Sequence, residues 1–268
     1  MNQQPELLLV TSSPHVHTPL TTSALMKDVV IALLPALCAS IYIFGIRAGV
    51  QVAVSVLSCV GFEALFCRLR KWENTTFNLP VAAPLWLPVV GSFLAIFIVK
   101  MLFGGLGKNF VNPALIGRVF LANSWSSDMV CWTQPVLNPL AWTTAADAIT
   151  GATPLGVVKS GVLPEAYTHA GQLWNMLLGV HGGCLGETCA LLLIAGGLYL
   201  LARGVITWHI PTAYLGTVAV LSLLFPPEGM SALLYTFYNL TGGGLLLGAF
   251  FMATDYVTSP LTPKGRLI

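Results

Sequence analysis

The residues best suited to chemistry lie together in the heptapeptide DAITGAT, residues 147–153. Its glycine-alanine pair leaves the backbone open to close approach by a bulky group. Thr153 offers a hydroxyl at the edge of that gap, and Asp147 and Thr150 could orient donors or a metal ion around it. The same residue types are common in ordinary turns and helix caps, so composition alone favours a turn over a binding site.

The elements that must position this heptapeptide are membrane helices. Only 8% of the 268 residues are Asp, Glu, Lys or Arg, and 56% are apolar. A typical soluble domain carries about 25% charged residues, so this chain could not cover a soluble surface with solvated groups. The composition therefore predicts an all-α, polytopic integral membrane helix bundle surrounded by lipid. The net charge of +2, without any basic block, excludes nucleic acid as a partner.

Charge-free runs locate the expected spans, because each approaches the ~20 residues that a helix needs to cross a bilayer. The six runs cover residues 29–46, 48–62, 74–99, 188–202, 204–227 and 229–254. Prolines crowd the start of the third run, so its helix is expected to begin near Leu85. Residues 112–123 form a shorter apolar piece interrupted by Arg118, which predicts a re-entrant half-helix.

The N-terminus does not resemble a cleavable signal peptide, because Lys27 is the only basic residue among the first 28. We therefore expect residues 1–26 to form an N-terminal cytoplasmic segment and residues 27–268 to form the membrane domain.

Basic residues predict the orientation of this domain. They cluster at residues 68–71 and 264–266, which the positive-inside rule places in the cytoplasm. Residues 124–183, which include the heptapeptide, are then an external segment.

The glycine-rich sequence GGLGKNFVNP, residues 104–113, precedes the half-helix. Glycine costs roughly 1 kcal/mol relative to alanine inside a helix, so this composition favours an irregular loop buried in protein. Such a loop could contact a ligand or an ion path. Alternatively, Gly105 and Gly107 allow close packing between helices and bind nothing.

Carboxylates at Glu63, Glu187 and Asp255 are further candidates, because a charge inside a membrane is costly and seldom kept without a use. Each lies near a predicted helix end, so placement at the membrane interface remains the alternative.

Five blocks of the sequence resemble a known family. The heptapeptide matches D-x-x-[ST]-G-A-T, an acceptor motif for covalent FMN. The other blocks are residues 13–26, 102–121, 185–197 and 252–265. In this order they resemble the D subunit of the Rnf electron-transport complex and its homologue, the B subunit of the sodium-translocating NADH:quinone oxidoreductase.

The resemblance implies that a flavin transferase moves FMN from FAD onto Thr153 through a phosphoester bond. The flavin-binding residues expected beside Thr153 belong either to the heptapeptide or to the region of the glycine-rich loop. They are Asp147, Thr150, Gly151, Ala152, Gly105, Gly107 and Asn112. The resemblance also raises the option of a second, non-covalent flavin (riboflavin), and it implies helices beyond those counted above.

The function implied is that of one multi-pass subunit in the bacterial inner (cytoplasmic) membrane. It would relay electrons between ferredoxin and NAD while Na+ or H+ crosses the membrane, as an electron carrier rather than an isolated catalyst. Other Rnf subunits would hold the iron–sulfur clusters and further flavins. The short N-terminal segment favours the D subunit of Rnf over the B subunit of the quinone reductase. A secondary transporter or channel without flavin is the competing class, because broken helices and glycine-rich pieces are typical of transporters.

Overall fold

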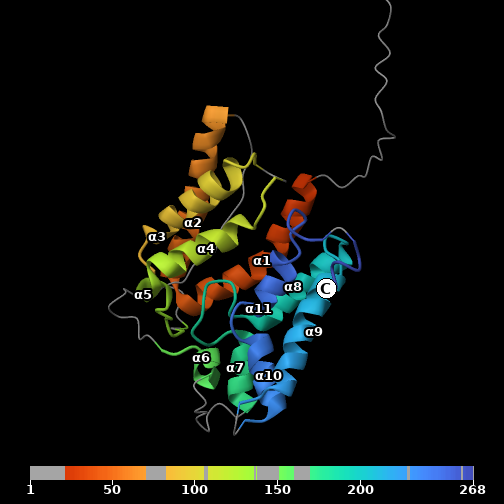
Figure 1. Cartoon of the computed structure of the whole chain (residues 1–268). Helices are drawn as coiled ribbons and strands as arrows, with labels where there is room; N and C mark the ends of the chain where they lie inside the picture. Colours follow the sequence, from red (N-terminus) through yellow and green to blue (C-terminus); the bar gives the residue numbers. More distant parts are fainter. Residues whose placement is uncertain are drawn as a thin grey trace, which may run out of the picture.

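The computed structural model describes residues 22–70, 83–105, 108–135, 137, 151–159, 170–227, 230–260 and 262–267. These parts of the chain form helices and contain no β-strand, which confirms the predicted all-α class. Figure 1 shows that the helices of the first half of the chain lie beside those of the second half, with α1 and α8 in contact between them.

The first two helices are long and apolar. α1 (Thr22–Phe44) and α2 (Ile46–Arg70) are joined at Gly45, whose φ of +81° is a conformation that glycine adopts without strain. Over Ala24–Phe44 and Ile46–Phe66 they are long and apolar enough to cross a membrane.

Three other apolar helices are shorter, namely Leu87–Met101, Ala190–Ala202 and His209–Leu224. Two of the six predicted spans therefore meet the length expected for crossing a bilayer, and the other four remain predictions.

The third predicted span begins at the expected place and then changes its winding. α3 (Leu87–Ser92) starts with proline in its first turn and continues directly as the π-helix η1 (Phe93–Met101). The wider winding persists where Leu102 N–H donates to Phe97 O at 3.2 Å, five residues back. Gly104 and Gly105 then have φ values of +111° and +85°, which ends the helix and confirms the irregular backbone predicted there.

The predicted half-helix is α4 (Pro113–Ser124). Asn112 caps it, because its Oδ1 accepts hydrogen bonds from the backbone N–H groups of Ala114 at 3.0 Å and Leu115 at 3.4 Å. Pro113 occupies the first turn, where its missing N–H is harmless. The short α5 (Ser126–Met129) follows directly.

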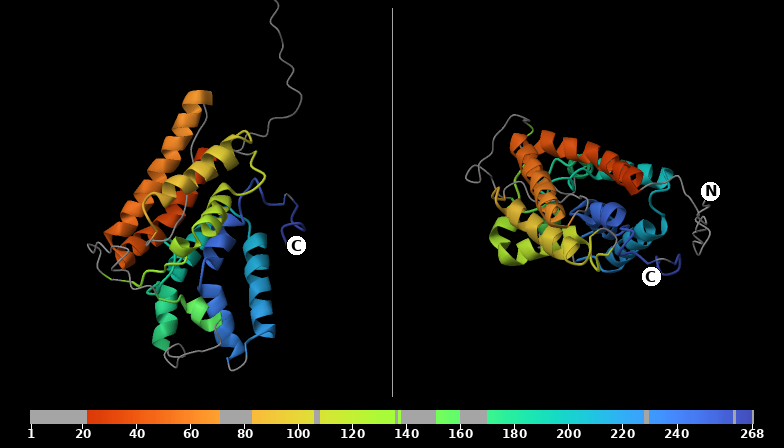
Figure 2. Two further views of the ribbon diagram at one scale, coloured as in Figure 1. Left: turned by 60° about the vertical axis from the view of Figure 1, so that its left-hand side comes forward. Right: turned by 90° about the horizontal axis from the view of Figure 1, so that it is seen from above.

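The second half of the chain contributes two short helices and a bundle. The short helices are α6 (Pro154–Lys159) and α7 (Ala170–Leu178). The bundle consists of α8 (Ala190–Ala202), α9 (His209–Leu224), α10 (Ala232–Thr241), α11 (Leu245–Leu247) and the π-helix η3 (Gly248–Met252). Figure 2 shows α9 lying alongside α10, and α8 packs against α1 around Ala32 and Ala36.

The prediction of one uninterrupted span over residues 229–254 is wrong. The helix stops at Thr241 and resumes only at Leu245. Three consecutive glycines make this break, and Gly243 has a φ of +63°. Glycine is a poor helix former, so three in a row end a helix unless neighbouring helices force the backbone to continue.

Contacts between distant segments bring several chain ends together at one end of the molecule. Arg203, after α8, pairs with Asp28 in α1, with Nη2 3.3 Å from Oδ2. Arg266 Nη1 donates to Thr207 Oγ1 at 3.2 Å, which holds the C-terminal residues beside the loop that precedes α9. Figures 1 and 2 show α6 and α7 at the opposite end from the last turns of α2.

Candidate functional site

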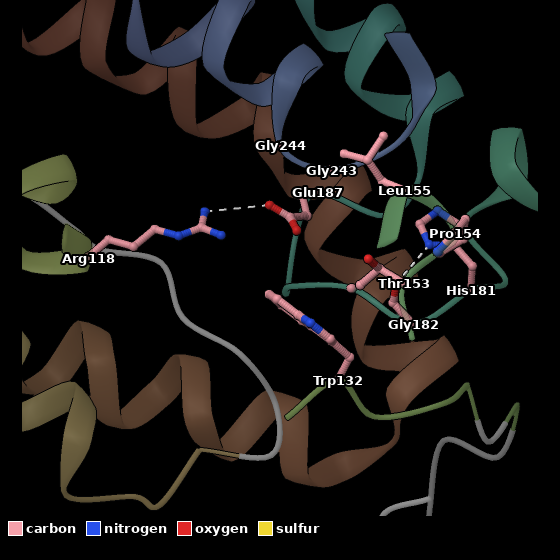
Figure 3. A pocket seen from close by; sticks show the side chains of 11 residues that line it. Arg118, Trp132, Thr153, Pro154, Leu155, His181, Gly182, Glu187, Gly243 and Gly244 are labelled. Carbon is pink, nitrogen blue, oxygen red and sulfur yellow. Dashed lines mark hydrogen bonds and ion pairs between the residues drawn. The ribbon is translucent and has the colours of Figure 1, made fainter. Parts of the chain in front are cut away.

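A cavity of about 200 Å³ lies where four chain segments meet. These segments are α4, the stretch around Trp132, the start of α6, and the two glycine-containing breaks that flank α8 and α11. Figure 3 shows the side chains that converge on it. The lining residues are Arg118, Trp132, Thr153, Pro154, Leu155, His181, Gly182, Gly183, Glu187, Gly243 and Gly244.

Thr153, the last residue of the heptapeptide, lines this cavity at the start of α6. Its Oγ1 accepts a hydrogen bond from Gly156 N–H at 3.1 Å, which fixes the side chain at the beginning of the helix. Gly151 N–H donates to Trp132 O at 3.3 Å and ties the heptapeptide to the neighbouring segment. A Cβ at Gly151 would overlap the side chain of Gln134, so the glycine permits this close approach.

The charged part of the cavity is built by Arg118 and Glu187. Arg118 Nη1 lies 3.6 Å from Glu187 Oε2, and Arg118 Nη2 donates to Cys184 Sγ at 3.2 Å. Glu187 Oε1 accepts from the backbone N–H of Cys184 at 3.0 Å, which orients the carboxylate. Figure 3 shows Arg118 entering from the side opposite to Thr153 and His181, with Glu187 between them in that view.

The break between α10 and α11 is shaped to this ion pair. A Cβ at Gly244 would lie 2.8 Å from Glu187 Oε2 and 3.9 Å from Arg118 Nη1. A side chain at this position would therefore displace the carboxylate, so glycine is required for the pair to pack against the backbone of the break.

Two buried polar atoms at the cavity, His181 Nε2 and Glu187 Oε2, have no hydrogen-bond partner among the described residues. The other ring nitrogen, His181 Nδ1, lies 3.1 Å from Gly182 O. Burial lowers the pKa of His181 from its ordinary value, so the imidazole is neutral at pH 7. Buried polar atoms are nearly always satisfied in native proteins, so these two indicate space for a polar ligand or water.

The structure brings together only part of the predicted site. Thr153 lines the cavity, with Gly151 and Ala152 directly before it. Gly105 and Asn112 are not among the lining residues, and the side chain of Asn112 is used as a helix cap. Their assignment to a flavin stays a prediction. The predicted residues Asp147, Thr150 and Gly107 lie outside the described residues.

Sequence reasoning missed the roles of Arg118, Trp132 and His181. The signal available for Arg118 was a single charge inside an apolar half-helix, and sequence alone gave it no partner. Nothing in the sequence spacing connects Trp132 or His181 with Thr153, because only the fold brings these loops together.

The candidate carboxylates take different environments. Glu63, for which interface placement was an alternative, is fully buried and pairs with Lys100, whose Nζ is 2.9 Å from Oε1. Glu187 is also buried, in the cavity described above. Asp255 is half-buried and accepts hydrogen bonds from Val257 N–H at 3.4 Å and Thr258 Oγ1 at 3.3 Å.

Comparison with known proteins identifies clear relatives, each the D subunit of a membrane oxidoreductase complex. The chain is 44% identical to that of the Na(+)-translocating ferredoxin:NAD(+) oxidoreductase complex of Acetobacterium woodii, over 97% of this chain and 81% of the relative. It is 36% identical to that of the proton-translocating ferredoxin:NAD(+) oxidoreductase complex of Clostridium ljungdahlii, over 98% and 82%. It is 35% identical to that of the ion-translocating oxidoreductase complex of Cronobacter sakazakii, over 97% and 85%.

A family model described as NQR2, RnfD, RnfE matches residues 9–268, nearly the whole chain. The match includes the helices, both glycine-containing breaks and the heptapeptide. The resemblance expected from the five sequence blocks is therefore confirmed, and the chain belongs to the NQR2, RnfD, RnfE family of membrane proteins.

Proposed function

We propose that this chain is the flavin-carrying subunit of a redox-driven, ion-translocating ferredoxin:NAD oxidoreductase complex, with FMN bound covalently to Thr153. The observation that carries the proposal is the position of Thr153. The last residue of a D-x-x-T-G-A-T motif lines a cavity with Arg118 and Glu187. An ordinary turn would need neither the cavity nor the buried charges.

The residues present fit a flavin. Trp132, Pro154 and Leu155 offer apolar surface for a ring system, and Arg118 offers a positive charge. His181 Nε2 and Glu187 Oε2 are buried atoms that lack hydrogen-bond partners among the described residues. FMN stores one or two electrons, and the protein positions and tunes it. The Thr153 hydroxyl would provide the phosphoester oxygen, while Gly156 N–H keeps this side chain at the start of α6.

The relatives support the wider function. Their names describe subunits of ion-translocating ferredoxin:NAD(+) oxidoreductases, so this chain would act with other subunits that hold iron–sulfur clusters and further flavins. One relative is named for Na+ and another for protons, and we assign neither ion here. Maturation would require a flavin transferase. The B subunit of a sodium-translocating NADH:quinone oxidoreductase is the alternative within the family.

We place the chain in the bacterial inner membrane as a multi-pass protein, with the flavin site on the external side. In support, Arg203 and Arg266 lie near the start of α1, while α6 is at the end of the molecule opposite to the end of α2. Basic residues at one end agree with the positive-inside rule.

The test is to produce the chain with a flavin transferase and to measure its intact mass and its in-gel fluorescence after denaturation. The unsubstituted chain should gain the mass of one FMN residue, and Thr153→Val should lose both the added mass and the fluorescence. Thr217→Val is a matched control, because its hydroxyl only donates to Ala213 O within α9. Denaturation-resistant flavin in the Thr153→Val protein would refute the assignment.

A further inference from the structure

The Arg118–Glu187 pair has a feature that packing alone does not require. It places a positive and a negative charge on the wall of the cavity that also contains Thr153. Any action of this pair on a flavin rests on the proposed function, because only that function holds a flavin at Thr153.

The geometry keeps Arg118 available to a ligand. Guanidinium groups carry five N–H donors. Within the described residues, one Arg118 nitrogen donates to Cys184 Sγ, and the distance of 3.6 Å to Glu187 Oε2 exceeds a good hydrogen bond. The Arg118 side chain is 33% exposed, whereas that of Glu187 is only 6% exposed. The cation is therefore held at the cavity wall by an anchored anion and still has donors to offer.

Three separate elements are shaped to maintain this arrangement. The half-helix α4 carries Arg118, the loop before α8 carries Glu187 and Cys184, and the break before α11 places Gly244 against the carboxylate. Burying a carboxylate is costly unless it is paired, so a cavity lined by this pair is retained at a cost in stability. Perturbed charges in a cavity are a common mark of a functional site.

We propose that Arg118 and Glu187 set the midpoint potential of the flavin: Arg118 stabilises the negative charge that the flavin gains on reduction, and Glu187 holds Arg118 in place while partly offsetting its charge. When a flavin accepts two electrons and one proton, its net charge becomes more negative by one. A nearby positive charge therefore favours the reduced form, and a nearby negative charge favours the oxidised form. Arg118 and Glu187 are positioning and tuning residues in this scheme.

The experiment is a redox titration of the covalently bound flavin in the full chain, purified in detergent after production with the flavin transferase. Dithionite supplies the electrons, and flavin absorbance reports the oxidised fraction. Arg118→Gln should lower the midpoint potential and Glu187→Gln should raise it. We expect about a tenfold change in the reduction equilibrium in each case, which is about 30 mV for a two-electron couple.

Two variants test whether such shifts come from charge at this place. Arg118→Lys keeps the positive charge and should restore most of the unsubstituted potential. Arg203→Gln is the matched control, because Arg203 pairs with Asp28 at 3.3 Å but does not line the cavity, and it should leave the potential unchanged. Shifts of opposite sign from the two members of one pair would not result from loosened packing alone.

The outcomes separate the role of the pair from the proposed function. Absence of covalent flavin from the unsubstituted chain would overturn both together. Covalent flavin with equal midpoint potentials in Arg118→Gln and Glu187→Gln would overturn only the role of the pair. If Arg118→Gln does not fold, Glu187→Gln decides alone: a raised potential supports the proposal, and an unchanged or lowered one refutes it.

Discussion

The buried pair between Glu63 in α2 and Lys100 in η1 gives a sharp prediction about stability. Lys100 Nζ lies 2.9 Å from Glu63 Oε1, and the two side chains are 2% and 0% exposed. Lys100→Met removes the positive charge and leaves a carboxylate that has very little access to water. Breaking a buried ion pair from one side costs about 3–5 kcal/mol, mostly through the charge that stays behind.

The expected shift in melting temperature follows from the size of the chain. One kcal/mol corresponds to about 2–4 °C for proteins of roughly 150–250 residues, so Lys100→Met should lower the apparent Tm by about 6–20 °C. A thiol-reactive fluorophore provides the assay, because Cys59, Cys184 and Cys189 are buried and free, and become reactive when the protein unfolds. The measurement needs no loaded cofactor, so it is independent of the flavin assignment.

A double variant separates charge burial from packing. Replacing both partners with apolar residues, Glu63→Leu with Lys100→Met, removes both buried charges and should recover most of the lost stability. Lys159→Met is the control, because Lys159 is exposed at the end of α6 and its loss should change stability by less than about 0.5 kcal/mol. The reasoning is refuted if Lys100→Met melts like this control, or if the double variant is less stable than Lys100→Met.

Two further predictions concern the break at Gly244 and the orientation in the membrane. Gly244→Ala places a Cβ 2.8 Å from Glu187 Oε2 and should cost about 1–3 kcal/mol through overpacking, seen as a lower Tm; Gly216→Ala, in α9, meets nothing within 4 Å and should not destabilise. Lys159→Cys, produced in a background in which the other cysteines are replaced, should react with a membrane-impermeant maleimide in intact cells if α6 faces outward. Labelling only after the membrane is opened would reverse the proposed orientation.

Much of the architecture was predictable from the sequence because a membrane leaves few options. Long charge-free runs must form helices, since the backbone groups have no water to bond with in lipid. This argument identified α1 and α2, and the short apolar run that ends the glycine-rich segment identified α4. It failed for residues 229–254, because hydropathy counts glycine as neutral and does not see that three together end a helix.

The attachment residue was also predictable, since a heptapeptide of seven adjacent residues is a local pattern that resembles an acceptor motif. Hydropathy and motif matching therefore determined the class of protein, the approximate helices and Thr153. The surroundings of Thr153 depended on the tertiary structure. Arg118, His181 and Glu187 meet beside it because α4, the loop before α8 and the break before α11 converge, and no sequence spacing relates these segments. Ion pairing acts over a few ångströms in space, so a charge inside an apolar helix acquires a partner, and with it a role, only when the fold brings that partner within reach.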